Sequence, residues 1–186
     1  DEYNPFLHNA WMMMGRSQFM NGDFLGSAST FFYISKHFTW LPETVTESKL
    51  WQARSYCSMD WLYEAEVIIT RIKQDDLTNK KLKYLYNVTY ADYLIKSGKY
   101  EQSVDYLKNA VNFTSGAQKS RLNFLLGQVY TRIGKKAEAY KAYGDAGKWN
   151  GATYRAKFNA RIKQSEVYEG ADITKEVNSL KRMTRY

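Results

Sequence analysis

The sequence has one cysteine, two prolines and two histidines among 186 residues. Cys57 is the single cysteine, so no intrachain disulfide is possible, and the His and Cys count argues against a zinc site. Pro5 and Pro42 are the prolines, and the chain after Pro42 permits long uninterrupted helices. No uncharged apolar run approaches 18 residues and no signal-peptide pattern is present, so we expect no membrane span in this sequence.

Motifs for catalysis are lacking as well. No Gly-x-Ser-x-Gly elbow and no His-Glu-x-x-His pair occurs. Gly127 and Gly134 bracket a helical pattern, and their spacing does not fit a phosphate-binding loop. His8 and His37 suit capping or surface roles, and Cys57 suits a packed or groove thiol. We therefore expect a protein that is not an enzyme and that holds no metal and no cofactor.

The charge is unevenly distributed. The chain carries 27 Lys and Arg against 19 Asp and Glu, a net charge of +8. Residues 1–93 hold 9 basic and 11 acidic residues, whereas residues 94–186 hold 18 and 8. A basic half attracts nucleic acid, anionic lipid or an acidic protein partner, but scattered lysines also simply keep a surface solvated. Both interpretations stay open on the sequence.

An internal repeat organises the chain. Four turn-like tetrads begin at Gly22, Asp60, Gly98 and Gly134, spaced by 38, 38 and 36 residues. A small residue stands seven positions before each turn and another five positions after it, namely Gly15, Ala53, Ala91 and Gly127, and then Ser27, Ala65, Ser103 and Ala139. Nine positions after each turn comes a large residue: Phe31, Ile69, Leu107 or Tyr143. Small residues recur in this way where helices cross closely, so we expect these eight to pack the repeats together.

The segments between turns have helical periodicity. Leu122, Leu125, Leu126, Val129 and Ile133 follow the i, i+3, i+4, i+7, i+11 spacing of one helix face. No strand-like alternation of comparable length occurs. Each unit is therefore predicted to be an antiparallel helix pair, and a pair must stack on its neighbours because it cannot bury both faces alone.

This pattern resembles the tetratricopeptide repeat, a helical hairpin with small residues at two set positions, a large residue four after the second, and a glycine turn. The pitch of 36–38 exceeds the usual 34, Asp60 replaces a turn glycine, and Lys136 replaces an aromatic residue. The resemblance implies an all-α, right-handed superhelical solenoid of about five antiparallel helix pairs. Its approximate units are residues 8–42, 43–79, 80–115, 116–150 and 151–186.

A narrower resemblance rests on four strings: Asn9–Gly15 (NAWMMMG), Trp40–Glu43 (WLPE), Tyr90–Leu94 (YADYL) and Phe158–Gln164 (FNARIKQ). They look like the tetratricopeptide outer-membrane lipoproteins of the type IX secretion and gliding-motility machinery of Bacteroidetes. That resemblance implies a periplasm-facing subunit, anchored to the outer membrane in the full-length protein and in contact with other secretion components. Members of that family are longer, so we expect this chain to be a soluble fragment. Exposure of Val177, Leu180 and Met183 on the last pair would support a truncated array.

Function is expected on the concave face, which the first helix of each pair lines in stacked hairpins. The partner-binding candidates combine apolar side chains with cations that can pair with a carboxylate. They are Arg16, Phe19, Met20, Arg54, Asp92, Lys96, Arg121, Phe124, Gln128 and Arg132. The alternative is that Arg16 and Arg54 bridge neighbouring repeats through Asp92.

These observations favour a non-enzymatic scaffold that binds other proteins, through a peptide or a helix in the groove. The ten partner-binding candidates do not reproduce the Lys/Asn clamp with which some tetratricopeptide domains hold a C-terminal carboxylate. Binding of nucleic acid or an anionic surface through the basic C-terminal half is the second hypothesis.

Overall fold

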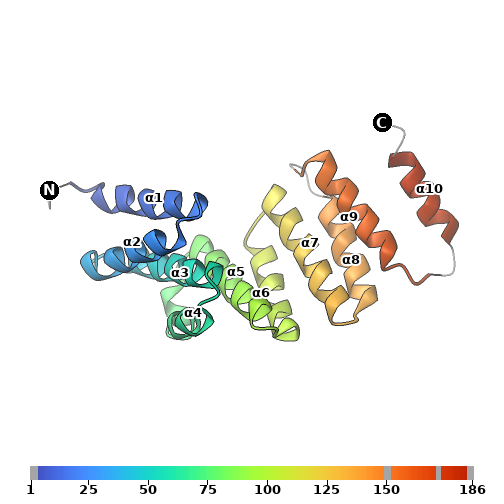
Figure 1. The fold of residues 1–186 in the computed structure, drawn as a ribbon. Coiled ribbons are helices and arrows are strands. Elements are labelled where there is room, and N and C mark those ends of the chain that lie inside the picture. The colour runs from blue at the N-terminus through green and yellow to red at the C-terminus, as the bar shows by residue number, and fades with distance from the viewer. Residues whose placement is uncertain (1–3, 149–151, 171–172, 184–186) are drawn as a thin grey trace. The chain divides into compact units, whose positions relative to one another are not determined.

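A computed structural model describes residues 4–148, 152–170 and 173–183. These residues form ten α-helices and one short 3-10 helix, and they contain no strand (Figure 1). The predicted all-α class is confirmed. The chain divides into two compact units, Asp1–Lys99 and Tyr100–Tyr186, each described by itself.

The first unit contains two helix pairs and the first helix of a third. We call the odd-numbered helices first helices and the even-numbered ones second helices. Here α1 packs on α2, α2 packs on α3, and α3 packs on both α4 and α5. The elements are α1 (Leu7–Met20), α2 (Phe24–His37), α3 (Pro42–Ser58), α4 (Leu62–Ile69), a 3-10 helix (Gln74–Asp76) and α5 (Lys80–Lys96).

The second unit contains the remaining second helix and two further pairs. Successive helices pack on each other, α6 on α7, α7 on α8, α8 on α9 and α9 on α10. The elements are α6 (Tyr100–Asn112), α7 (Gly116–Arg132), α8 (Lys136–Lys148), α9 (Tyr154–Glu166) and α10 (Ile173–Met183).

The four turns of the repeat share one hydrogen-bond pattern. The residue after each turn residue donates its N–H to the carbonyl five positions earlier, at N···O distances of 2.8–2.9 Å. The turn residues have φ of +83° at Gly22, +59° at Asp60, +74° at Gly98 and +76° at Gly134. Glycine adopts this conformation freely, whereas a residue with a Cβ is strained there by about 1–2 kcal/mol. Asp60 therefore holds its turn at a cost that the three glycines avoid.

The eight small residues of the repeat all lie buried. Two of them make room for an aromatic ring of the same hairpin. A Cβ placed on Gly15 would lie 2.8 Å from Cζ of Phe31, and one on Gly127 would lie 2.6 Å from Cδ1 of Tyr143. Each glycine thus receives the large residue that comes nine positions after the turn, so the ring fills the space that a side chain would otherwise occupy.

The second pair departs from the others because α4 ends after eight residues. The following segment is held by two buried apolar side chains, Ile72 and Leu77. Asp76 accepts a hydrogen bond from the Lys73 N–H at 2.9 Å, so this acid caps the 3-10 helix. Asn79 then caps α5 by accepting from the Leu82 N–H at 3.0 Å. This connection takes up part of the 38-residue spacing from Asp60 to Gly98 that a longer second helix would otherwise fill.

The fifth pair is held together by polar side chains. Glu176 on α10 is buried and accepts hydrogen bonds from Tyr140 on α8 at 2.7 Å and from Ser165 on α9 at 3.1 Å. It also pairs with Arg161 at 3.0 Å. Val177 is exposed and Leu180 is half-buried; the Met183 side chain and the turn at 171–172 lie outside the described residues.

Candidate functional site

The first-helix face of the first unit is built by α1, α3 and α5. We use this name for the surface formed by Arg16, Phe19, Glu47, Arg54, Asp92 and Lys96. Three of the six are spaced alike, because Arg16, Arg54 and Asp92 each stand six positions before their turn. The regular repeat thus gathers residues that are 38 apart in sequence onto neighbouring helices.

One carboxylate joins all three helices of this face. Glu47 on α3 is buried, and its carboxylate accepts hydrogen bonds from Arg16 on α1 and from Lys81 Nζ on α5, the latter at 2.7 Å. The Arg16 guanidinium also lies 5.9 Å from the centroid of the Trp51 ring. Arg16 therefore bridges neighbouring repeats through Glu47, whereas the sequence interpretation placed Asp92 in that role.

Arg54 occupies a different environment. Its guanidinium carbon lies 4.6 Å from the centroid of the Trp51 ring and 5.3 Å from that of Phe19. Burial lowers the pKa of Arg54, and the nearby carboxylate of Asp92 offsets part of this effect. Within the described residues Arg54 makes no hydrogen bond and no ion pair. The aromatic rings therefore hold the guanidinium in place, and its N–H groups donate to no described residue.

Next to it, Lys96 on α5 reaches the turn between α3 and α4. Its Nζ donates to the Cys57 carbonyl at 2.7 Å and to the Asp60 carboxylate at 2.8 Å. The hydrogen bond to Asp60 raises the pKa of Lys96. Burial raises the pKa of the Cys57 thiol to about 12, so this cysteine stays protonated and is a poor nucleophile. Burial likewise raises the pKa of Asp92.

The remaining candidates do not join this cluster. Met20, at the end of α1, is largely exposed. Three candidates on α7 in the second unit have separate surroundings: Arg121 and Gln128 are exposed, and Phe124 packs on Tyr143 with ring centroids 5.4 Å apart. Arg132, also on α7, lies 5.2 Å from the ring of Tyr100 on α6.

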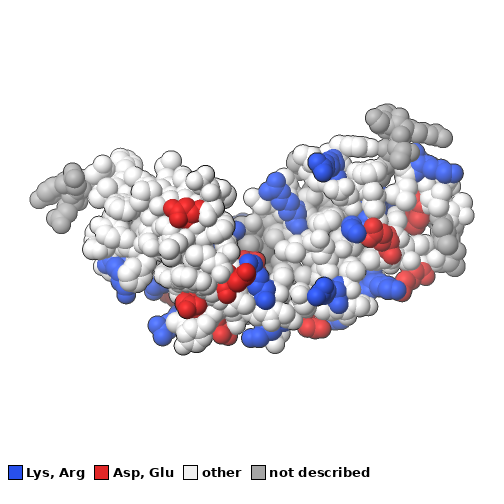
Figure 2. Space-filling view, viewed as in Figure 1, with Lys and Arg blue, Asp and Glu red and all other residues white. Residues whose placement is uncertain are grey.

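The second unit carries the excess positive charge of the chain. Residues 100–186 contain 16 Lys and Arg against 8 Asp and Glu, whereas residues 1–99 contain 11 of each. Figure 2 shows blue side chains spread over the visible face of the second unit, while the visible face of the first unit is mostly white. The prediction of a basic C-terminal half thus corresponds to one structural unit.

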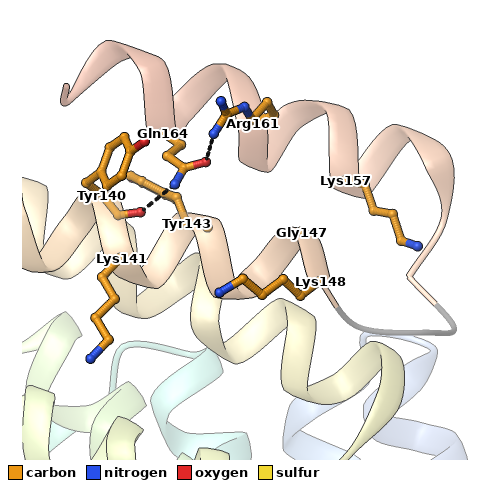
Figure 3. Close-up of a pocket in the computed structure, with 9 residues that line it drawn as sticks. Tyr140, Lys141, Tyr143, Gly147, Lys148, Lys157, Arg161 and Gln164 are labelled. Atoms are coloured by element: carbon orange, nitrogen blue, oxygen red, sulfur yellow. Dashed lines mark hydrogen bonds between the residues drawn. The ribbon is translucent and has the colours of Figure 1, made fainter. Parts of the chain in front are cut away.

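A pocket of about 510 Å³ lies between α8 and α9 in this unit. At its back Gln164 donates to the Tyr140 carbonyl at 3.1 Å and accepts from Arg161 (Figure 3). Figure 3 shows Lys148 lying along α8 beside Gly147 and Lys141 directed away from α9. The lining residues are Tyr140, Lys141, Tyr143, Gly144, Gly147, Lys148, Lys157, Arg161 and Gln164. Every charged residue among them is a cation.

A second pocket, between the start of α1 and the end of α2, is lined by both histidines. His37 stacks on Tyr33 with centroids 4.0 Å apart, and His8 lies 6.3 Å from Phe38. No cluster of three His, Cys, Asp or Glu suited to a metal ion occurs within the described part of the chain. Aromatic contacts therefore dominate the surroundings of the two imidazoles.

Three members of these sites were not among the partner-binding candidates predicted from the sequence. Trp51 and Lys81 were not singled out, although Trp51 precedes Arg54 by three residues on the same helix face. Glu47 stands thirteen residues before its turn, a position that the repeat spacing assigns to the groove, but its pairing with Arg16 was not predicted. The α8–α9 pocket has no sequence signal beyond the local density of lysines.

Comparisons with known proteins come from structure alone, since the sequence matches no protein-family model and no curated protein. The chain is similar over 96% of its length to a Signal Transduction ATPase with Numerous Domains from Pyrococcus horikoshii, which has a tetratricopeptide repeat sensor. That match has a TM-score of 0.78 and 12% identity. Two crystal structures of MamA match 98% and 92% of this chain, with TM-scores of 0.64 and 0.62 and identities of 17% and 18%. The fold is tetratricopeptide-like.

These likenesses concern the fold. The chain spans 29% of the length of the ATPase and 92% of each MamA chain. None of the three structures is named as a secretion or gliding protein, so that narrower resemblance stays a prediction. None of the helices described here is both long enough and apolar enough to cross a membrane.

Proposed function

We propose that this protein is a non-enzymatic scaffold that binds other proteins on the first-helix face of its first unit. The observation that carries this proposal is Arg54, whose guanidinium lies against the rings of both Phe19 and Trp51 and makes no hydrogen bond with the described residues. A planar guanidinium held in this way is preorganised for two parallel hydrogen bonds to a carboxylate. The expected ligand is an acidic side chain or a chain terminus of a partner, with Met20 exposed beside the face for apolar contact.

The test is a binding measurement with the partner identified by crosslinking from Met20. Arg54→Ala removes the charged hydrogen bonds, worth about 1.5–3 kcal/mol, and should weaken binding about 10-fold to 150-fold. Arg54→Lys keeps the charge and should retain part of the affinity. Lys49→Ala is the matched control, because Lys49 is an exposed cation of the same helix outside this face. Full affinity of Arg54→Ala would show that the face is not the binding site.

Arg16 should behave differently from Arg54. Because Arg16 is already paired with Glu47, Arg16→Ala is expected to lower the free energy of unfolding and to leave affinity within a few-fold. Measuring both quantities for both variants separates the residue that contacts the partner from the residue that joins the repeats.

The identity of the partner is proposed from the resemblance to the type IX secretion lipoproteins. On that basis the protein faces the periplasm, is anchored to the outer membrane in its full-length form, and contacts secretion subunits. Crosslinking in the cell envelope, followed by mass spectrometry, should recover envelope proteins of that machinery. Recovery of cytosolic proteins alone would overturn this part of the proposal and leave the Arg54 site standing.

A second candidate function is favoured by the α8–α9 pocket. Its four cations and tyrosine rings suit an anionic ligand such as the phosphate backbone of a nucleic acid. Binding of a labelled oligonucleotide should fall steeply with salt and be weakened most by Lys148→Glu with Lys157→Glu. Lys135→Glu is the control, since Lys135 is an exposed cation of the same unit outside the pocket lining. The absence of binding at low salt would end this candidate.

A further inference from the structure

A pocket of about 560 Å³ lies between α2, α3 and the end of α4, within the first unit. Its size is that of small-molecule sites in proteins, which span about 300–1,000 Å³. It does not lie at an end of the described array, because α1 precedes these helices and α5 follows them. The last turn of α4 contributes Val67 and Ile68, and the connection after it contributes Arg71 and Ile72. The pocket therefore lies where the second pair departs from the repeat.

One side chain of this pocket is buried without a hydrogen-bond partner. Thr46 on α3 is 7% exposed, and its hydroxyl makes no hydrogen bond with the described residues. Among those residues, Arg16 Nε is the side-chain N or O atom that is both enclosed and without a partner. The Thr46 oxygen is therefore not enclosed, and it opens onto the pocket that this residue lines. A hydroxyl in this state offers a ligand both a donor and an acceptor.

The repeat explains why this hydroxyl is free. Thr46 stands fourteen residues before its turn, and the residue at the same position on α7 is Ser120. The Ser120 hydroxyl donates at 2.7 Å to the carbonyl of Ala146 on α8, which stands twelve residues after the turn. The same position of the second pair is Ile72, and α4 has ended before it. The early end of α4 thus leaves Thr46 without the helical carbonyl that its counterpart uses.

Cations and apolar side chains line the rest of the pocket. Two of its cations, Lys36 and Arg71, are exposed and form no ion pair with the described residues. Lys36 Nζ lies 5.4 Å from the centroid of the Phe32 ring, which is itself 51% exposed. The acidic residue of the lining, Asp76, already accepts a hydrogen bond from the Lys73 N–H. The pocket thus offers unpaired positive charge beside apolar surface.

We propose that this pocket binds a small organic anion with an apolar body, such as a medium-chain carboxylate. The Thr46 hydroxyl donates to the anionic group, and Lys36 and Arg71 offset its charge. The apolar body lies against Val67 and Ile68, which are half-buried in the free chain. The site shares no residue with the first-helix face or with the α8–α9 pocket, so it stands or falls independently of the proposed function.

The probes are decanoate, its uncharged analogue decanol, and acetate, each titrated into the whole chain by isothermal titration calorimetry. Decanoate should bind at one site. Decanol should bind about 10-fold more weakly or less, because it cannot pair with the cations, and acetate should not saturate the chain, because it lacks the apolar body. The absence of decanoate binding would overturn the proposal, and so would equal affinities for decanoate and decanol.

Variants then locate the site. Thr46→Val removes the hydroxyl and should weaken decanoate binding about 10-fold or more, without lowering the free energy of unfolding, because the hydroxyl has no partner in the folded chain. Lys36→Glu with Arg71→Glu should abolish the binding. Lys80→Glu is the matched control, because Lys80 is an exposed cation of the same unit outside the lining, and it should bind decanoate as the native chain does. Native affinity in Thr46→Val or in the double variant would show that decanoate binds elsewhere and would overturn the proposal.

Discussion

The two units use one packing pattern and carry different surfaces. In the first unit, basic and acidic residues are equal in number, and the charges of the first-helix face are largely paired internally, as Glu47 is with Arg16 and Lys81. In the second unit, basic residues are twice as numerous as acidic ones, and Lys141 and Lys157 make no ion pair with the described residues. The repeat thus fixes the buried positions and leaves the exposed ones free to serve different ligands.

The largest expected change in the free energy of unfolding tests whether the two units share the packing of a large ring against a glycine. Phe31 in the first unit and Tyr143 in the second are both fully buried against a glycine. Replacing either by Ala should lower the free energy of unfolding by about 3–5 kcal/mol, as measured by urea denaturation. Phe32→Ala, at the exposed neighbour of Phe31, should change it by less than about 0.5 kcal/mol. A large loss in one unit alone would mean that the two do not share a core pattern.

Two glycines in the second unit, replaced by Ala, should change the free energy of unfolding by smaller amounts and in opposite directions. Gly127→Ala forces a Cβ against the Tyr143 ring, and the strain of about 1–3 kcal/mol exceeds the gain in helix propensity. Gly147→Ala meets no atom within 4 Å and should raise the free energy of unfolding by up to about 1 kcal/mol. Equal effects of the two substitutions on thermal unfolding would contradict the ring-in-glycine packing.

The turn at Asp60 distinguishes the first unit from the second, whose turn residue is Gly134. Asp60→Gly removes left-handed strain of about 1–2 kcal/mol and loses an exposed ion pair worth about 0–1 kcal/mol, so a small gain in stability is expected. Asp60→Ala keeps the strain and loses the pair, so it should be less stable than the native chain. If Asp60→Ala proves as stable as Asp60→Gly, the positive φ is not a source of strain.

The smallest effect concerns pH and is confined to the first unit. Because burial raises the pKa of Asp92, the folded chain holds this proton more tightly than the unfolded chain does. The contribution of Asp92 to stability is therefore greatest below its ordinary pKa of 3.8 and is lost as pH rises through the folded value. Asp92→Asn should become more stable relative to the native chain between acid and neutral pH. A difference that does not change with pH would refute this assignment.

Much of the fold was readable in the sequence because small and large residues recur at fixed distances from a turn. Ala53 and Ala65 mark the second pair even though Asp60 replaces its glycine. The early end of α4 was not predicted, because Ile68 and Ile69 continue a helical pattern and the stop depends on how Ile72 and Leu77 pack.

The candidate site was predicted less completely. The spacing of residues from their turns placed Arg16 and Arg54 on one face, but it could not show that Arg16 pairs with Glu47 while Arg54 packs against aromatic rings. That distinction depends on side-chain direction across three helices, which spacing along one helix does not reveal.

The four turns close on their own helices, since each hydrogen bond joins a residue to a carbonyl five positions earlier in the same hairpin. Duplicating or deleting a hairpin therefore leaves these backbone hydrogen bonds of the turns unchanged, and only side-chain bonds between repeats, such as that from Lys96 to Asp60, have to be made anew. The length of such a protein is adjustable in steps of 36–38 residues, so gene duplication can add new binding surfaces while the older ones are kept intact.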